Sequence, residues 1–195
     1  MTDRSPDEIL KFWLEDVGPQ KWWISDRATD EACERFMPEV ERAARGELDH
    51  WSENAESALA LILLLDQFPR NLFRYDPRAF ATDAKALSHA RQAVAKNLDL
   101  KIETALRQFF YLPFEHSENL ADQEMCLALF EARVPDMGAN TRRALEGHHR
   151  LIADFGRFPY RNAVLGREST PQEQRYLDDP KAYRPGQKTE ADSES

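Results

Sequence analysis

One segment of the chain, residues 58–68, limits its possible folds more than any other. It reads ALALILLLDQF and is apolar on every side of a helix. Such a helix is stable only when other helices or a membrane surround it. The apolar run is much shorter than the roughly 18 residues that a membrane span needs. We therefore expect this segment to form the buried central helix of a soluble, all-helical domain.

Capping and terminating residues predict the other helices. SPDE, from Ser5, and TPQE, from Thr170, each combine an N-cap hydroxyl, a first-turn proline and a glutamate three residues after the cap. Gly46 and Gly156 suit the left-handed residue that follows a helix, and Pro69 is expected to end the central helix. No alternating pattern typical of β-strands is found. About eight helices are expected, over residues 6–16, 29–45, 54–68, 77–97, 100–112, 118–134 and 140–155 and after Thr170.

Four residues refine these boundaries. Pro38 is expected to kink or split the second helix, and Pro113 to end the fifth. Asp76 precedes a proline and is expected to cap the fourth helix, and Ser117 is expected to cap the sixth.

Length and charge indicate one acidic domain. The 195 residues are enough to bury about 70% of the unfolded surface. The net charge of −9 argues against nucleic acid as a partner, because phosphate backbones are bound by clustered Lys and Arg. The start, MTDRSPDEIL, lacks the pattern of a signal peptide, so we expect a cytoplasmic location without membrane contact. Cys33 and Cys126 are expected to be reduced, buried thiols. Residues 1–177 should form a single helical domain, and the polar residues 178–195 a largely disordered tail.

Two similar segments carry charges next to predicted helix ends. LDQFPRN places Asp66 in the last turn of the central helix. The helix dipole is unfavourable for a carboxylate at this end unless a cation lies next to it. Arg70 is the local candidate. FGRFPYRN, near the end of the chain, carries similar groups. If the two segments meet, they form a polar cluster of Asp66, Arg70, Asp154, Arg157 and Arg161.

The densest polar segment is YLPFEHSENLADQE, residues 111–124. One interpretation is structural: Ser117 caps a helix and Glu118 favours its N-terminus. A second makes Glu115 and His116 the hydrogen-bonding wall of a ligand pocket whose other wall is the arginine-bearing cluster. A third makes Glu115 and His116 catalytic, or ligands of a metal ion.

The sequence does not favour a metal site. Metal ligands must converge from several elements. His148 and His149 are adjacent, so they point to different faces of a helix and cannot both line one site. Motifs for zinc, acyl transfer and phosphate binding are absent, so no metal or cofactor is assigned and an enzymatic role is left open. The plausible ligand set would be Glu115, His116, His148, His149 and Asp154.

Two loops add candidates. NAVLGREST is a connector that delivers a cap for the last helix, and it leaves Arg167 to close a buried charge network or to line the rim of a pocket. KWWISD places Trp22 and Trp23 in a loop, where tryptophan more often fills a core or covers a groove than stacks on a ligand.

Several of these motifs, in this order, resemble a bacterial family catalogued as domain of unknown function 924: ILKFWL, WW, LALILLLDQFPRN, RAFATD, FFYLPFEHSE, ADQE, FGRFPYRN and LGREST. The resemblance runs from about residue 9 to residue 177. It implies an all-α fold like that of tetratricopeptide-repeat proteins, with stacked antiparallel helix pairs, and no established activity. The chain lacks the repeat period of roughly 34 residues, so peptide binding in a repeat groove does not carry over. It also has Tyr160 where the family pattern has histidine.

Three hypotheses follow. The first is a protein that binds a small-molecule or peptide carboxylate, or another anion. The second is a hydrolase that uses His116 with Glu115 or a bound metal. The third is a scaffold or interaction module whose polar motifs lock helix ends together. The sequence gives neither the ligand nor the oligomeric state. The residues assigned to ligand binding are Asp66, Arg70, Glu115, His116, Arg157, Arg161 and Arg167.

Overall fold

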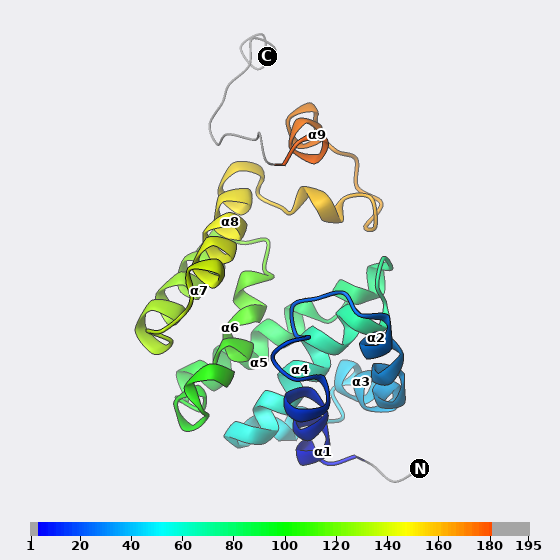
Figure 1. Ribbon diagram of the computed structural model, residues 1–195, viewed down its shortest axis with the longest axis vertical. Coiled ribbons are helices and arrows are strands. Elements are labelled where there is room, and N and C mark those ends of the chain that lie inside the picture. Colours follow the sequence, from blue (N-terminus) through cyan, green and yellow to red (C-terminus); the bar gives the residue numbers. More distant parts are fainter. Residues whose placement is uncertain (1–3, 181–195) are drawn as a thin grey trace.

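The computed structural model describes residues 4–180, and within this range every regular element is a helix, which confirms the all-α fold class (Figure 1). The α-helices are α1 (Pro6–Lys11), α2 (Arg27–Cys33), α3 (Met37–Arg45), α4 (Ala55–Leu72), α5 (Asp83–Ala95), α6 (Gln108–Glu115), α7 (Leu120–Arg133), α8 (Ala139–Phe155) and α9 (Pro171–Asp178). A π-helical segment, η1 (Phe12–Val17), extends α1. Short 3₁₀ helices connect other elements: η2 (Glu34–Phe36), η3 (Asp49–Glu53), η4 (Pro77–Phe80), η5 (Asp99–Lys101), η6 (Thr104–Leu106) and η7 (Pro159–Arg161).

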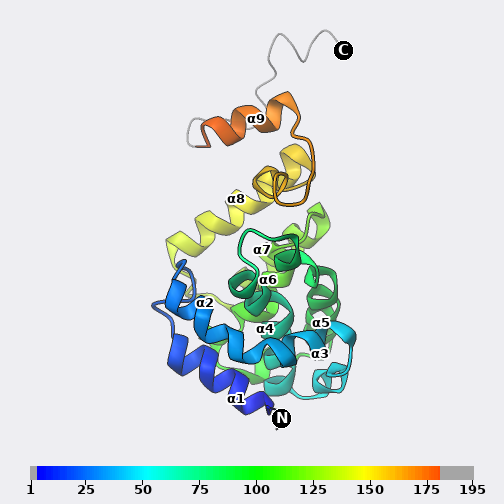
Figure 2. The same cartoon turned by 90° about the vertical axis from the view of Figure 1, so that its right-hand side faces the viewer.

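Helix α4 is the buried centre of the bundle, as its apolar run predicts. Residues 58–69 are all buried. Helices α1, α2, α3, α5 and α6 pack against it, and Figures 1 and 2 show them around it. Burial of each Leu or Ile side chain is worth roughly 1.5–3 kcal/mol, so this helix organises the core. Neighbours in sequence also pack as pairs, such as α6 with α7 and α7 with α8. The likeness to tetratricopeptide repeats stays a prediction.

The predicted caps are present at both ends of the chain. Ser5 and Thr170 each accept a hydrogen bond from the backbone N–H of the glutamate three residues later. The carboxylate of that glutamate in turn accepts a hydrogen bond from the backbone N–H of the cap residue. Gly46 and Gly156 end α3 and α8 in the left-handed conformation, with φ of 86° and 68°. Pro38 splits the second predicted helix, because α2 passes through η2 before α3 begins.

Two predicted helix ends are wrong, because α4 and α6 continue through their prolines. Pro69 lies inside α4, which runs to Leu72, and Pro113 lies inside α6. Proline has no N–H for the carbonyl four residues before it. For Pro69 that carbonyl belongs to Leu65, and it accepts a hydrogen bond from Thr82 Oγ1 at 2.6 Å instead. A tertiary partner therefore replaces the bond that proline removes.

Three other boundaries differ from the predictions. Asp76 caps only η4, and α5 starts later at Asp83. The segment expected as one helix from residue 100 is two short 3₁₀ turns before α6. Ser117 does not cap α7: its hydroxyl donates to Asp122 Oδ2 at 2.7 Å, and Asn119 accepts from the backbone of the first turn. Helix α7 begins only at Leu120, so Asn119 occupies the cap position and Ser117 lies two residues before it.

The C-terminal elements add a second small apolar cluster. Leu151, Ile152 and Phe158 are buried together, with Phe155 and Tyr176 packed against them. In Figures 1 and 2, α9 lies beyond the C-terminal end of α8, at the end of the molecule opposite to α1. Most of the tail expected from residue 178 lies outside the described residues, and the division into one domain and a tail stays a prediction.

The two cysteines have the environment that the sequence predicts. Cys33 and Cys126 are buried and unpaired, as expected, and burial raises the pKa of the Cys33 thiol to about 12. Among residues 4–180, no helix has both the length and the apolar composition that crossing a bilayer requires.

Candidate functional site

The two Phe-Pro segments meet at one carboxylate. The first Phe-Pro segment (residues 66–71) supplies Arg70, which donates to both oxygens of Asp83 at 2.9 and 3.0 Å. The second Phe-Pro segment (residues 156–162) supplies Arg161, whose Nη1 lies 3.4 Å from Asp83 Oδ2. The structure therefore brings Asp66, Arg70 and Arg161 together, as the cluster hypothesis predicts. Asp83, at the start of α5, joins them.

Asp66 is a fully buried carboxylate with three partners. Gln67 Nε2 donates to Oδ2 at 2.5 Å, Arg70 Nη1 lies 3.2 Å from Oδ1, and His116 Nδ1 lies 2.7 Å from Oδ1. Burial alone would raise the pKa of Asp66, but the positive charge of Arg70 and the hydrogen bonds from His116 and Gln67 hold it well below its usual value. Asp66 is therefore ionised, and we assign the proton of His116 to Nδ1, which leaves Nε2 for other contacts.

Arg161 is held as part of the frame. Its guanidinium lies between the rings of Phe80 and Phe158, at 4.6 and 4.5 Å from their centroids, and Nη1 donates to the backbone oxygen of His116 at 3.1 Å. Burial lowers the pKa of Arg161 from its ordinary value. Its Nε is buried without a hydrogen-bond partner in the described part of the chain. This side chain fixes where α6 ends and thereby the position of His116.

Glu115 bonds to a different histidine. Its Oε1 lies 2.5 Å from Nδ1 of His148, which is carried by α8, and Gln123 Nε2 donates to its backbone oxygen at 2.6 Å. The adjacent residues Glu115 and His116 thus belong to two separate carboxylate–imidazole pairs. The sequence hypothesis treated Glu115 and His116 as one unit, whereas the structure pairs His116 with Asp66.

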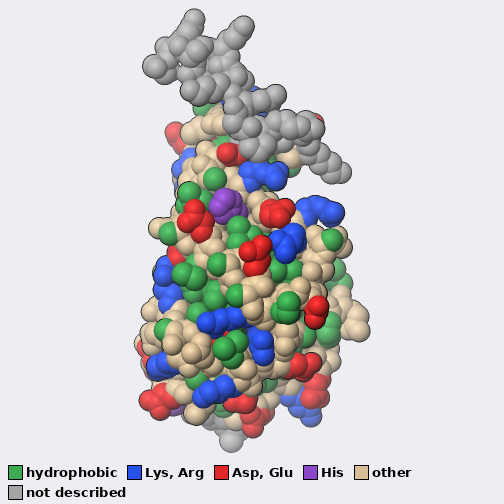
Figure 3. All heavy atoms as spheres, turned by 90° about the vertical axis from the view of Figure 1, so that its left-hand side faces the viewer, with side chains coloured by type: hydrophobic (Ala, Val, Ile, Leu, Met, Phe, Trp, Pro, Cys, Tyr) green, Lys and Arg blue, Asp and Glu red, His purple; other side chains and the backbone are tan. Residues whose placement is uncertain are grey.

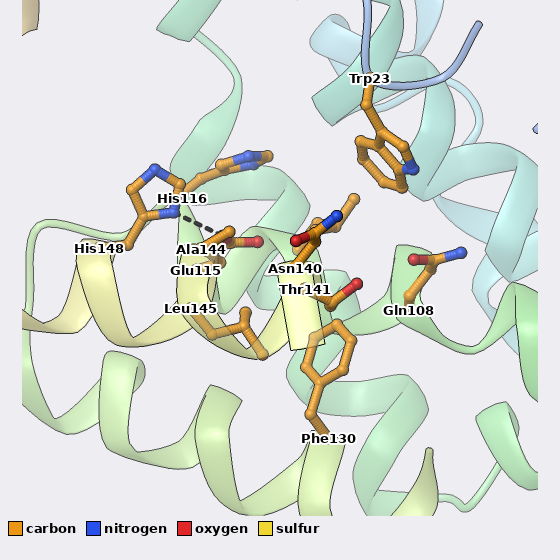
Figure 4. Close-up of a pocket in the computed structure, with 11 residues that line it drawn as sticks. Trp23, Gln108, Glu115, His116, Phe130, Asn140, Thr141, Ala144, Leu145 and His148 are labelled. Atoms are coloured by element: carbon orange, nitrogen blue, oxygen red, sulfur yellow. Dashed lines mark hydrogen bonds and ion pairs between the residues drawn. The ribbon is translucent and has the colours of Figure 1, made fainter. Parts of the chain in front are cut away.

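A pocket of about 460 Å³ lies between α6 and α8 and contains one ring of each pair (Figure 4). Figure 4 shows the His116 and His148 rings at one end and Trp23 and Gln108 toward the other. The apolar side chains of Leu112, Phe130 and Leu145 line it between these ends. We call this space the main pocket. It is lined by Trp23, Gln108, Leu112, Glu115, His116, Phe130, Asn140, Thr141, Ala144, Leu145 and His148.

The two histidine side chains present their Nε2 atoms without internal partners. The side chains of His116 and His148 are 16% and 30% exposed. Within residues 4–180, neither Nε2 has a hydrogen-bond partner, and neither is a fully buried atom. An imidazole whose Nδ1 is fixed by a carboxylate has a defined orientation and one nitrogen left to bind a ligand or move a proton. We call His116 and His148 the imidazole wall.

Arg157, Arg167 and Asp154 lie away from the imidazole wall. Arg157 donates to Glu173 Oε1 and Oε2 at 2.5 and 2.8 Å, and this hydrogen bonding lowers the pKa of Glu173 to about 2. Arg167 donates to both oxygens of Glu118 at 2.6 and 2.9 Å. Asp154 lines a different pocket, together with Arg157. The cluster expected from the two segments therefore divides into a buried part and a peripheral part.

His116 also borders a second pocket, of about 380 Å³. Phe80, Asp83, Glu118 and Arg161 line its other side. The acidic side chains here already have internal partners, Asp83 in Arg161 and Glu118 in Arg167, so they leave fewer polar atoms for a ligand than the imidazole wall does.

Sequence reasoning missed two residues that shape the site. Asp83 was quoted only as the end of RAFATD, and its pairing with an arginine from each Phe-Pro segment depends on the tertiary fold. His148 was considered only as a metal ligand. Trp23 is 57% exposed and stacks on Phe109 with centroids 5.9 Å apart, so it covers the mouth of the main pocket, which fits the expected role of covering a groove. In the part of the chain that the structure describes, no three His, Cys, Asp or Glu side chains are grouped to hold a metal ion.

Comparisons with known proteins give a family and a fold but no activity. A family model described as "Bacterial protein of unknown function (DUF924)" matches residues 9–181. A solved structure of a protein of unknown function, ATU0120 from Agrobacterium tumefaciens, is 44% identical and superposes with a TM-score of 0.82. The match covers 89% of this chain and 97% of that one. No curated protein matches the chain.

Proposed function

Because the chain belongs to the bacterial family of unknown function DUF924, whose description supplies no activity, we propose a function from the geometry: the protein binds a small organic molecule in the main pocket. One observation carries the proposal. An apolar pocket ends in two imidazoles whose Nδ1 atoms are held by buried carboxylates and whose Nε2 atoms have no internal partner.

The main pocket has the dimensions and composition of a ligand site. Its volume of about 460 Å³ lies within the roughly 300–1,000 Å³ of small-molecule pockets, which are mostly apolar with a few placed polar groups. Leu112, Phe130 and Leu145 suit the apolar part of a ligand, and Trp23 offers an exposed ring at the mouth. The imidazole wall suits a polar group at the other end.

The arginines are better explained as the frame than as ligand clamps. Arg70, Arg157 and Arg167 each donate to both oxygens of an internal carboxylate. An anion that displaced such a carboxylate would leave it buried and unpaired, which is costly. We therefore retain Glu115 and His116 from the binding hypothesis and place the ligand in the main pocket, away from these three arginines. The proposed ligands include short peptides. We also keep the cytoplasmic location as a proposal.

Filling the pocket tests the proposal. Ala144 is exposed on α8 at the pocket wall, so Ala144→Trp should block the pocket without disturbing the core. Ala132→Trp, at an exposed position on α7, is the matched control. In a thermal-shift screen of small organic molecules, a ligand at 100 times its Kd should stabilise the protein by about 2.7 kcal/mol. The shift should be lost in Ala144→Trp and kept in Ala132→Trp. Equal shifts in both variants would contradict binding in this pocket.

A hydrolase is the second candidate, and the Asp66–His116 pair favours it. A general base needs an oriented imidazole with an accessible nitrogen, and His116 has both. Water would be the nucleophile, and no metal or cofactor is assigned. An ester and amide screen with His116→Gln tests it, with His149→Gln as the control because His149 does not line the main pocket. Hydrolysis that survives His116→Gln would rule out this residue as the base. If the protein neither binds a small molecule nor hydrolyses an ester or amide, the scaffold role fits it better.

A further inference from the structure

Another pocket, different from those described above, adjoins the main pocket along α8. This side pocket, of about 290 Å³, shares Ala144 and His148 with the main pocket, so the two spaces meet at His148. Their linings differ in kind, because the main pocket is largely apolar whereas the side pocket is basic. The side pocket is lined by Arg143, Ala144, Gly147, His148, Arg150, Leu151, Tyr160, Tyr176 and Pro180.

The two arginines of the side pocket differ from those of the frame. Arg70, for example, is neutralised by Asp83. Arg143, however, donates to the amide oxygen of Asn140 at 3.1 Å, and neither Arg143 nor Arg150 has a carboxylate partner among residues 4–180. Both are exposed, so they are available to an anion. Figure 3 views the molecule from the left of Figure 1, and on this face basic side chains are interspersed with acidic and hydrophobic ones. Two neighbouring arginines without a carboxylate partner differ from that mixed pattern.

Other groups around the side pocket are hydrogen-bond donors. Burial raises the pKa of Tyr160 to about 12, although the nearby Arg161 opposes the shift, so its hydroxyl keeps its proton near neutral pH. Burial also raises the pKa of Tyr176. Glu115 holds Nδ1 of His148, which lines both spaces, and leaves Nε2 without a partner among residues 4–180. Glu115 is itself buried, and its side chain is bonded to His148.

We infer that the ligand is an amphipathic carboxylate whose apolar part lies in the main pocket and whose anionic end reaches Arg143 and Arg150 past His148. The inference rests on the proposed function and names its ligand class. Guanidinium groups bind carboxylates through charge-assisted, often bidentate hydrogen bonds, which are roughly twice as strong as neutral ones. The apolar part removes surface from water against Trp23 and Phe130, which both line the main pocket.

Matched ligands test the inference. Calorimetric titrations would compare straight-chain and phenyl-substituted monocarboxylates of about six to ten carbons, a size suited to such a pocket, with primary alcohols of the same skeletons. Carboxylates should bind about tenfold or more tightly than the alcohols. The double variant Arg143→Gln/Arg150→Gln should remove this preference and leave alcohol binding unchanged. Arg142→Gln is the control, because Arg142 is on the same helix but pairs with Glu131.

A second variant blocks the side pocket without removing a charge. A Cβ at Gly147 would meet nothing within 4 Å, and glycine in a helix is unfavourable, so Gly147→Leu should fold. It should reduce the affinity for carboxylates to that for alcohols.

Each outcome decides a different point. Equal affinities for carboxylates and alcohols, or a preference that survives Arg143→Gln/Arg150→Gln, would overturn the inference and leave the proposed function standing. If neither series binds, the inference fails, and the thermal-shift screen with Ala144→Trp and Ala132→Trp decides the proposed function separately.

Discussion

The two Phe-Pro segments share four letters and have different structures. In the first, Phe68 and Pro69 are inside α4, and the helix continues to Leu72. In the second, Phe158 is extended with ψ of 107°, and Pro159 begins the separate turn η7. The same dipeptide thus lies inside a helix once and follows the end of a helix once.

The surroundings explain the difference. At the first segment, Thr82 supplies a hydrogen bond to the carbonyl that Pro69 cannot serve, and the helix is buried on all sides. At the second, Gly156 has already ended α8 in the left-handed conformation before Pro159 is reached. Proline therefore decides neither helix end, because Thr82 supplies the missing bond at Pro69 and a glycine ends α8 before Pro159. Both segments still deliver an arginine to Asp83.

The largest expected effect is the loss of the buried carboxylate of the first segment. Asp66→Ala leaves His116 without its acceptor and Arg70 with one carboxylate fewer, so it should cost about 3–5 kcal/mol of unfolding free energy. Asp154, the acid that precedes the second segment, is only half-buried. Asp154→Ala should therefore cost about 1 kcal/mol or less of unfolding free energy. Urea denaturation measures both. Equal losses would show that the two helix ends are alike.

The second segment should depend more on the Arg157–Glu173 pair. Glu173→Gln keeps a capping side chain but removes the charge, and it should cost about 2 kcal/mol at pH 7. Because Arg157 lowers the pKa of Glu173 to about 2, from about 4.3 when unfolded, the pair stabilises the protein fully above about pH 4.3 and is lost as the pH falls toward 2.

The unfolding free energies of the wild type and Glu173→Gln should therefore converge below about pH 4.3. Urea titrations at several pH values check this. A difference that does not change with pH would mean that Glu173 acts through packing alone.

A smaller effect isolates the replaced hydrogen bond of the first segment. Thr82→Val removes the donor to the Leu65 carbonyl and should cost about 1–2 kcal/mol, because a buried acceptor loses its partner. Pro69→Ala restores a backbone N–H to that carbonyl. The double variant should then be less destabilised than the sum of the single variants. Additive costs would show that Thr82 does not substitute for the helix bond.

The smallest effect concerns the glycine of the second segment. Gly156 has φ of 68° and nothing within 4 Å of a Cβ, so Gly156→Ala should cost about 1 kcal/mol through backbone strain alone. Gly147→Ala, in the middle of α8, should instead stabilise by about 0.5–1 kcal/mol. Thermal unfolding of the two variants should shift in opposite directions. Shifts of the same sign would contradict the role given to Gly156.

The sequence predicted the features that depend on local chemistry. The capping boxes at Ser5 and Thr170, the left-handed glycines and the buried central helix follow from residue types and their spacing alone. The continuation of α4 through Pro69 did not, because Thr82 lies in another element and its proximity is a property of the tertiary fold.

The candidate site could be predicted only in part for the same reason. Asp66 with Arg70 is a contact within one helix, and the sequence identified it. Glu115 with His148 joins α6 to α8, and Arg161 reaches Asp83 across the fold, so neither pairing has a local signal. Successive residues of a helix also point about 100° apart, which is why the adjacent residues Glu115 and His116 bond to different partners.

The most direct test of the account is a nitrogen-15 NMR spectrum of the histidine side chains, recorded with and without a ligand from the thermal-shift screen. We predict that Asp66→Asn changes the imidazole signals of His116 and Glu115→Gln those of His148, and that the ligand shifts the Nε2 signals of both. Ligand-induced shifts confined to other histidines, or an Asp66→Asn variant that leaves His116 unchanged, would contradict an imidazole wall held by two buried carboxylates.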